Sequence, residues 1–338
     1  MITDARVLRE EFVPADVVHR DAEVNALSRV LEPISDGEDA RPALVTGPSG
    51  VGKTTITKFV VGRLKESLLD IESVHVNCWQ SYTRFGAIYA ILEGLGQTLD
   101  VHRRSTPHDE LLEKLAAYDG PPVIVTLDEV DQLDDARLVY DLYRLDNFSF
   151  VLVTNDEEQL LADLDERVRS RLQTAETIHF DRYHVEELTD IIAARAEHGL
   201  VQNAITTEQL AWIADAAAGD ARIGLSILRS AARRADQANA DTITPEHIQA
   251  AIPEGRHEVR SRTLDTLRPG QRLVYEIVEE HDQLSPKEIY EAYADRASDP
   301  RTKRTVRSWL GKLTKYNLLE AQGSGPNRVY EPSQSLLD

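Results

Sequence analysis

Residues 47–55 of this chain read GPSGVGKTT. This stretch fits the pattern G-x-x-x-x-G-K-[ST], with Gly47, Gly52, Lys53 and Thr54 at the defining places. Glycines let the backbone turn tightly enough for several N–H groups to point at one phosphate. In this pattern the lysine reaches the β and γ phosphates, and the hydroxyl is a Mg²⁺ ligand. The stretch therefore predicts a phosphate-binding loop.

The sequence on both sides supports this interpretation. Residues 43–46, ALVT, form a short apolar run typical of a buried strand, and residues 54–69 have helical spacing. The helix N-terminus would add its dipole to the anion site. We therefore expect ATP or ADP with Mg²⁺ as ligands. The candidate nucleotide contacts in the loop are Gly47, Pro48, Ser49, Gly50, Val51, Gly52, Lys53, Thr54 and Thr55.

A second motif, PPVIVTLDE at residues 121–129, is a continuous apolar run that ends in two acids. Such a run is typical of a buried parallel strand whose carboxylates emerge at the carboxyl edge of the sheet, where a phosphate loop also lies. Asp128 would then hold Mg²⁺ together with Thr54, and Glu129 would orient or deprotonate the water that attacks the γ phosphate. The alternative is a solvated strand end without a catalytic role.

Further strands are expected at residues 73–77, 148–155 and 177–180, and the second of them ends at Asn155. Asn155 would sit beside Glu129 and help to position the water. Helices over 21–31, 82–98 and 111–118 alternate with these strands, which predicts a parallel, three-layer α/β domain over residues 1–182. His19 and Arg20 precede the first helix, where they would touch the nucleotide or simply begin that helix.

From residue 185 onward the pattern is helical. Helices are expected over 185–198, 206–217, 220–237 and 244–252, forming a lid domain over residues 183–258 in which Arg222 would point back toward the nucleotide. A third domain, 259–338, is predicted as a winged helix. Its expected elements are helices over 270–281, 286–295 and 300–316 and a hairpin of strands 318–321 and 328–331.

The helix over 300–316 has two different faces. Val306, Trp309, Leu310 and Leu313 recur at helical spacing and must face a core. Residues 301–338 hold seven Lys and Arg and three Asp and Glu, a net charge of +4, so the other 300 residues carry −24. A basic face within so acidic a chain favours a duplex DNA partner, whereas the alternative is a solvated helix in a protein-binding winged helix. The candidate DNA contacts are Arg301, Arg304, Arg307, Ser308, Lys312, Lys315 and, in the wing, Arg328.

The overall composition limits the other possibilities. The net charge is −20, and only eight of the 38 basic residues are Lys. This balance suggests adaptation to a salt-rich cytoplasm, the alternative being an ordinary acidic protein. The single cysteine, Cys78, excludes internal disulfides and a cysteine-based zinc site. No apolar run approaches a membrane span of about 20 residues, and the charged N-terminus has no signal-peptide core, so we expect a cytoplasmic, nucleoid-associated protein without a membrane partner.

The chain resembles the archaeal origin-recognition and replication-initiator family of AAA+ ATPases. The resemblance rests on VPADVVHRDAEVNAL, GPSGVGKTT, VNCWQSYTRFGAIYAILEGLG, VIVTLDEVDQL, LVTND, LDERVRSRL, GDARIGLSILRSA and the terminal winged helix. It implies that Asn155 is the first sensor residue and Arg222 the second. It also implies that Tyr183 and Arg195 contact the nucleotide, that Arg171 or Arg167 is an arginine finger for a neighbouring copy, and that Arg84 touches DNA. One departure is Ile223-Gly224 after GDAR, where the family often has Arg and Ala.

The resemblance implies an ATP-dependent initiator that binds duplex origin DNA and helps to recruit or load the replicative helicase, with other initiator copies as possible partners. ATP hydrolysis would be slow and act as a switch. Two alternatives stay open. One is a signalling or clamp-loading ATPase whose winged helix binds protein, and the other is a transposition or plasmid helper that binds DNA with little sequence preference.

Overall fold

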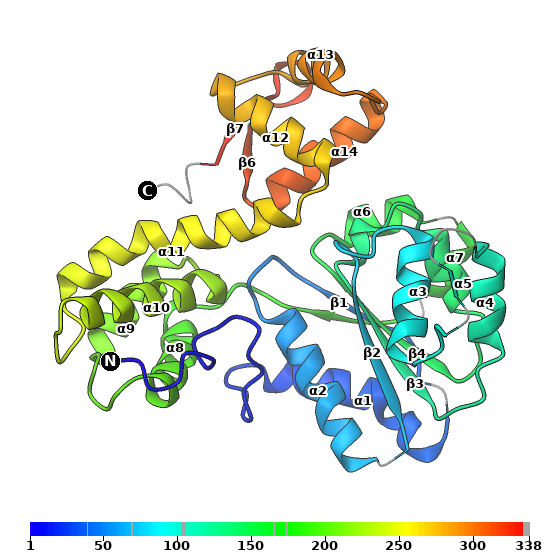
Figure 1. The fold of residues 1–338 in the computed structure, drawn as a ribbon, viewed down its shortest axis with the longest axis horizontal. Helices are drawn as coiled ribbons and strands as arrows, with labels where there is room; N and C mark the ends of the chain where they lie inside the picture. The colour runs from blue at the N-terminus through cyan, green and yellow to red at the C-terminus, as the bar shows by residue number, and fades with distance from the viewer. Residues whose placement is uncertain are drawn as a thin grey trace. The chain divides into compact units, whose positions relative to one another are not determined.

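The computed structural model describes residues 1–38, 40–68, 70–99, 101–102, 106–164, 166–172 and 175–333 (Figure 1). The chain forms two units. The first is Glu11–Arg182, and the second joins Met1–Glu10 to the chain from Tyr183 onward. No pattern in the sequence indicates that the first ten residues pack with the later part of the chain. The division into three domains at residues 182 and 258 stays a prediction.

The first unit is built on a five-stranded parallel sheet with the strand order β2-β3-β4-β1-β5. Thr46 at the end of β1 is level with Thr154 of β4, so the carboxyl ends of the strands meet at one edge. Every residue of β1, β3 and β4 is buried, as expected for parallel strands covered on both faces. The strands are β1 (Ala43–Thr46), β2 (Glu72–Asn77), β3 (Val123–Asp128), β4 (Phe148–Thr154) and β5 (Glu176–His179).

Helices cover both faces of this sheet and make the unit three-layered (Figure 1). On one face α1 (Asp21–Leu31) and α2 (Lys53–Ser67) pack over alternate strand residues such as Ile124 and Val151. On the other face lie α3 (Arg84–Gly94), α4 (His108–Ala116), α5 (Arg137–Leu142), α6 (Glu157–Asp163) and α7 (Glu166–Leu172). Short 3-10 turns, η1 (Glu32–Asp36) and η2 (Val130–Gln132), follow α1 and β3.

The sequence predicted these strands to within about two residues, whereas some helices differ from the expectation. The helix expected over 82–98 is shorter, because the side chain of Thr83 accepts a hydrogen bond from Gly86 N and starts the helix at Arg84. The helices α5 and α6 were not anticipated. No helix within the described part of the chain is both long enough and apolar enough to cross a membrane.

The second unit begins with a bundle of four helices, α8 (Val185–Gly199), α9 (Thr207–Ala216), α10 (Ala221–Gln237) and α11 (Pro245–Thr266). The helix expected to end at residue 252 instead runs through Pro253 to Thr266. Packing explains this continuation. A Cβ at Gly255 would lie 2.7 Å from Ile227 N, so the glycine allows the backbones of α10 and α11 to approach closely. Leu8 of the N-terminal segment is fully buried in the same core.

The C-terminal part has the element order predicted for a winged helix. Three helices, α12 (Pro269–His281), α13 (Pro286–Arg296) and α14 (Lys303–Lys315), precede an antiparallel hairpin of β6 (Leu319–Gln322) and β7 (Val329–Pro332), joined through η3 (Gly325–Asn327). An isolated bridge joins Leu284 to Tyr330 and ties the α12–α13 connection to the hairpin. As predicted, Val306, Trp309, Leu310 and Leu313 of α14 are buried.

Candidate functional site

The loop between β1 and α2 has the backbone that its glycines predict. Gly47, Gly50 and Gly52 have φ values of 145°, 81° and 90°, a region that favours glycine. Gly47 is needed for a second reason as well. A Cβ at this position would lie 2.2 Å from the backbone oxygen of Phe180, which follows β5. The loop therefore lies directly against the backbone that follows β5.

Lys53 is buried at the start of α2 and directs its ammonium group across the loop. Its Nζ donates to the backbone oxygens of Gly47 and Pro48, at 2.8 and 2.6 Å, and to Asn155 Oδ1 at 2.6 Å. A positive charge held beside a loop of backbone N–H groups at a helix N-terminus is suited to the phosphates of a nucleotide.

Asn155 connects Lys53 with the acidic end of β3. While its Oδ1 accepts from Lys53, its Nδ2 donates to Glu129 Oε2. Glu129 lies directly after β3 in the left-handed region, with φ 57° and ψ 44°. This conformation costs a residue other than glycine about 1–2 kcal/mol, and such outliers are enriched at functional sites. The structure thus brings Lys53, Glu129 and Asn155 together, as the sequence predicted.

Asp128 and Thr54 form the candidate magnesium site. Thr54 Oγ1 donates to Asp128 Oδ2 at 2.8 Å, which leaves the hydroxyl lone pairs available to a cation. Asp128 Oδ1 is buried and accepts no hydrogen bond from the described residues. A hydroxyl and a carboxylate oxygen are the hard ligands that Mg²⁺ prefers, and Mg²⁺ usually keeps several waters. These two residues therefore fit the ion, and the unused acceptor Asp128 Oδ1 would accept a hydrogen bond from one of its waters.

Three buried polar side chains support the same edge of the sheet and were missed by sequence reasoning. Thr154 Oγ1 donates to Asp131 Oδ1 at 3.0 Å, and Gln132 Nε2 donates to Asp131 Oδ2 at 2.7 Å. Asp131 thereby ties the turn after β3 to the end of β4, the two places that carry Glu129 and Asn155. The sequence shows an acid at position 131, but it does not show that this acid contacts Thr154 on β4.

Arg20 is buried and serves as an anchor within the first unit. Its guanidinium pairs with Glu23 at 2.6 Å, donates to Asp181 O at 2.7 Å and lies 5.2 Å from the ring centroid of Phe180. It therefore holds the start of α1 against the residue that backs Gly47. His19 has φ 60° just before the helix. A direct contact of either residue with nucleotide stays a prediction.

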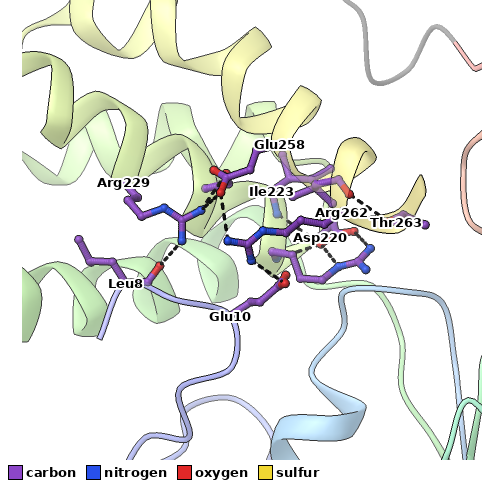
Figure 2. A network of polar contacts seen from close by, with 11 residues as sticks. Leu8, Glu10, Asp220, Ile223, Arg229, Glu258, Arg262 and Thr263 are labelled. Atoms are coloured by element: carbon purple, nitrogen blue, oxygen red, sulfur yellow. Dashed lines mark hydrogen bonds and ion pairs between the residues drawn. The ribbon is translucent and has the colours of Figure 1, made fainter. Parts of the chain in front are cut away.

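In the second unit Arg222 lies at the start of α10 and pairs with Asp220, with Nη2 2.7 Å from Asp220 Oδ2. Asp220 also caps the helix by accepting from the backbone nitrogens of Arg222 and Ile223. Beside it, Figure 2 shows Glu258 of α11 between two arginines. Arg229 Nη2 lies 2.6 Å from Glu258 Oε1 and Arg262 Nη2 lies 3.1 Å from it, while Arg262 also pairs with Glu10.

Tyr183 and Arg195 both lie in the core of the second unit. Arg195 Nη1 donates to Val7 O at 3.1 Å, and burial lowers the pKa of Arg195. Tyr183 packs with the apolar residues of the four-helix bundle. These contacts give both residues a structural role, and the nucleotide contacts implied by the resemblance stay predictions.

The outer face of α14 and the hairpin present the candidate DNA contacts. Arg301, Arg304, Arg307, Lys315 and Arg328 are exposed, and Ser308 and Lys312 are half-buried. Thr302 caps the helix by accepting from Thr305 N. The N-terminus of a helix carries a partial positive charge, and the basic residues near the start of α14 add to it.

The remaining predicted site residues belong to α3 and α7, which lie on the face of the first unit's sheet opposite to α1 and α2. Arg84, at the start of α3, is paired: its Nη2 lies 2.6 Å from Asp141 Oδ2, and its side chain is 23% exposed. A contact of Arg84 with DNA stays a prediction. The side chains of Arg171 and Arg167 lie outside the described part of the chain.

Two family models match the chain. Residues 16–154 match the AAA ATPase domain, and residues 189–253 match the Cdc6 AAA+ ATPase-type lid domain. The parallel sheet with its phosphate loop is thus the nucleotide-binding core of an AAA+ ATPase, followed by a lid of the Cdc6 type.

Individual relatives show to which family of AAA+ ATPases the chain belongs. The chain is 53% identical over its whole length to ORC1-type DNA replication protein 9 of Halobacterium salinarum, covering 94% of that protein. It is 48% identical, over 91% of its length, to ORC1-type DNA replication protein 1 of the same organism, which it covers completely. The solved structure of the Aeropyrum pernix ORC1 protein in complex with DNA is 26% identical, with a TM-score of 0.76 over 99% of this chain and 95% of that one. The chain belongs to the family of ORC1-type DNA replication proteins.

Proposed function

We propose that this protein is an ATP-dependent replication initiator that binds duplex origin DNA through α14 and the β6–β7 hairpin. In this proposal it helps to recruit or load the replicative helicase, acts with other copies of initiator, and works in the cytoplasm at the nucleoid. The bound nucleotide would regulate this activity. ATP and ADP would occupy the loop Gly47–Thr55 with Mg²⁺, and slow hydrolysis would end the active state.

The main support for DNA binding is the positive charge of the exposed face of α14. Its apolar residues are buried, so its arginines and lysines are directed outward. Residues 301–338 carry a net charge of +4, whereas the other 300 residues carry −24. The negative charge of the rest of the chain repels the DNA phosphates. A local basic face offsets this repulsion and allows the protein to bind DNA. The related ORC1 protein of Aeropyrum pernix was solved in complex with DNA.

The hydrolysis part rests on the group of three at the carboxyl edge of the sheet. Glu129 is the candidate base for the attacking water, and Asn155, which donates to it, keeps its carboxylate in place. Lys53 neutralises charge on the phosphates. Bound Mg²⁺ would supply Lewis acidity toward the phosphate oxygens. Within this chain the water is thus oriented by Glu129 and Asn155, and the phosphate chain by Lys53 and the loop.

The test is binding of the purified protein to a fluorescent duplex taken from beside its own gene. The assay is run with ATP in molar potassium salt, because so acidic a chain with halobacterial relatives is expected to need salt to fold. A random duplex of equal length is the control. A preference of about a hundredfold or more, approaching the range of specific readers, supports the initiator. Equal binding favours the nonspecific helper, and binding to neither duplex favours a protein partner.

A further inference from the structure

His75 is directed toward the candidate magnesium site by the geometry of the sheet. It lies on the edge strand β2, where Val74 and Val76 are buried on one face and His75 must point to the other. In the parallel register His75 is level with Thr126 and Asn77 with Asp128. Alternation along β3 puts Thr126 and Asp128 on the face that α2 covers, which is therefore also the face of His75.

The contact is made with one particular oxygen. His75 Nε2 lies 3.4 Å from Asp128 Oδ2, which is the oxygen that also accepts from Thr54 Oγ1. The Asp128 side chain is 5% exposed and that of His75 is 30% exposed. Two neighbours thus gather on Oδ2, whereas Oδ1 is buried without a hydrogen bond from the described residues. A carboxylate held by one oxygen presents the other in a fixed direction.

We propose that His75 is a positioning residue for magnesium-dependent nucleotide binding: together with Thr54 it holds Asp128 Oδ2, so that Asp128 Oδ1 faces the cation and its waters. This inference rests on the proposed function, because it needs a nucleotide and Mg²⁺ at the loop. Groups that hold a metal-binding carboxylate in place typically change metal affinity or activity by about 10- to 100-fold when they are removed.

A second His–Asp pair in the same unit provides a comparison. His179 Nε2 lies 3.3 Å from Asp181 Oδ1, a similar separation, but these side chains are 60% and 88% exposed and lie at β5, the opposite edge of the sheet. Solvent screens such a pair, and its loss has little effect. His75 differs because its partner is buried and is itself a candidate ligand of the metal.

The experiment measures nucleotide affinity against free Mg²⁺ at one fixed pH, with a fluorescent ATP analogue as the probe. Four variants are compared: His75→Leu, which removes the ring nitrogens; His75→Gln, whose amide nitrogen reaches the place of Nε2; His75→Asn, whose amide is too short to reach; and His179→Leu as the matched control. Affinity in EDTA and the thermal midpoint show whether each variant is folded.

We expect His75→Leu and His75→Asn to raise the half-saturating Mg²⁺ concentration by about tenfold, with affinity in EDTA unchanged, and His75→Gln and His179→Leu to resemble the native protein. Equal Mg²⁺ dependence in all five proteins would overturn the role of His75 while leaving the proposed function intact. A failure of His75→Gln to restore the native value would overturn it as well. If the native protein itself showed no Mg²⁺-dependent binding, the proposed function would fail, and this inference with it.

Discussion

Lys53 and Asn155, which stand 102 positions apart in the chain, are joined by a hydrogen bond of 2.6 Å from Nζ to Oδ1. Because Asn155 also donates to Glu129, one amide links the cation that would hold the phosphates to the acid that would orient the water. A shift of Lys53 on nucleotide binding would therefore be transmitted through Asn155 to the side chain of Glu129. This relationship gives two separable expectations, one for binding and one for hydrolysis.

The binding expectation concerns Lys53. Replacing it by alanine should lower the affinity for ATP by about a hundredfold or more, since hydrogen bonds to charged groups contribute about 1.5–3 kcal/mol each. Titration with a fluorescent nucleotide measures this. Lys58→Ala is the control, because Lys58 lies on the same helix but is exposed. Native affinity in Lys53→Ala would remove the phosphate-loop assignment.

The hydrolysis expectation concerns Glu129. In Glu129→Gln the water loses its base while the loop is untouched, so the hydrolysis rate should fall by about 10²- to 10⁴-fold with ATP affinity close to native. Phosphate release in single-turnover assays, run beside the nucleotide titration, measures both quantities. If the rate stayed native, another group would have to be the base. If affinity fell in parallel, Glu129 would be part of the binding site instead.

The DNA-binding face leads to a prediction about salt. Arg304→Ala combined with Arg307→Ala should weaken duplex binding and reduce the slope of log affinity against log salt by about two, since each neutralised phosphate contributes about 0.9. The matched control is Arg6→Ala with Arg137→Ala, which removes two exposed arginines that pair with acids elsewhere. An unchanged slope in the α14 variant would place the DNA interface on another surface.

Glu258 leads to a prediction about stability. Burial alone would raise the pKa of Glu258, but hydrogen bonds from Arg229 and Ser226 outweigh it and the net shift is downward. Glu258→Gln leaves the buried Arg229 without its charged partner and should lower the free energy of unfolding by about 2 kcal/mol, less than for a fully buried pair because Glu258 is 32% exposed. Glu254→Gln, one turn earlier and paired with the exposed Arg234, should cost about 0–1 kcal/mol.

The pH dependence of this effect has a definite sign. A carboxyl whose pKa is lower in the folded state stabilises the fold above its ordinary pKa of 4.5, and this contribution is lost as the pH falls through the folded value. The difference in stability between the native protein and Glu258→Gln should therefore be constant near neutral pH and shrink below about 4.5. Denaturant unfolding at a series of pH values measures it, and a difference that grew in acid would contradict the assignment.

The features predictable from sequence are those that depend on short stretches of chain. The apolar runs at β1, β3 and β4 predicted buried parallel strands, and parallel strands carry the residues after them to one edge. That rule was enough to bring Asp128, Glu129 and Asn155 together beside the loop. The periodicity of α14 likewise predicted its buried and exposed faces.

The features that could not be predicted depend on register and on distant packing. Alternation along β2 shows that His75 and Val74 face opposite ways, but only the pairing with β3 shows that His75 meets Asp128. A proline in a helical pattern usually marks an end, yet α11 continues past Pro253 because residues on both sides of it pack in the core. The buried position of Leu8 has no periodic signal at all.

The N-terminal segment also sets the order in which the molecule can be completed. Three groups of this segment accept hydrogen bonds from arginines much later in the chain: Val7 O from Arg195, Leu8 O from Arg229 and the carboxylate of Glu10 from Arg262. The partners of these bonds are 188, 221 and 252 positions apart. A ribosome therefore releases the first ten residues long before their partners exist, whereas every residue of the sheet unit lies between them and can pack as it emerges. The unit that holds both the lid helices and α14 closes only after residue 262 has been made, so during synthesis the ATPase sheet precedes the part that would read DNA.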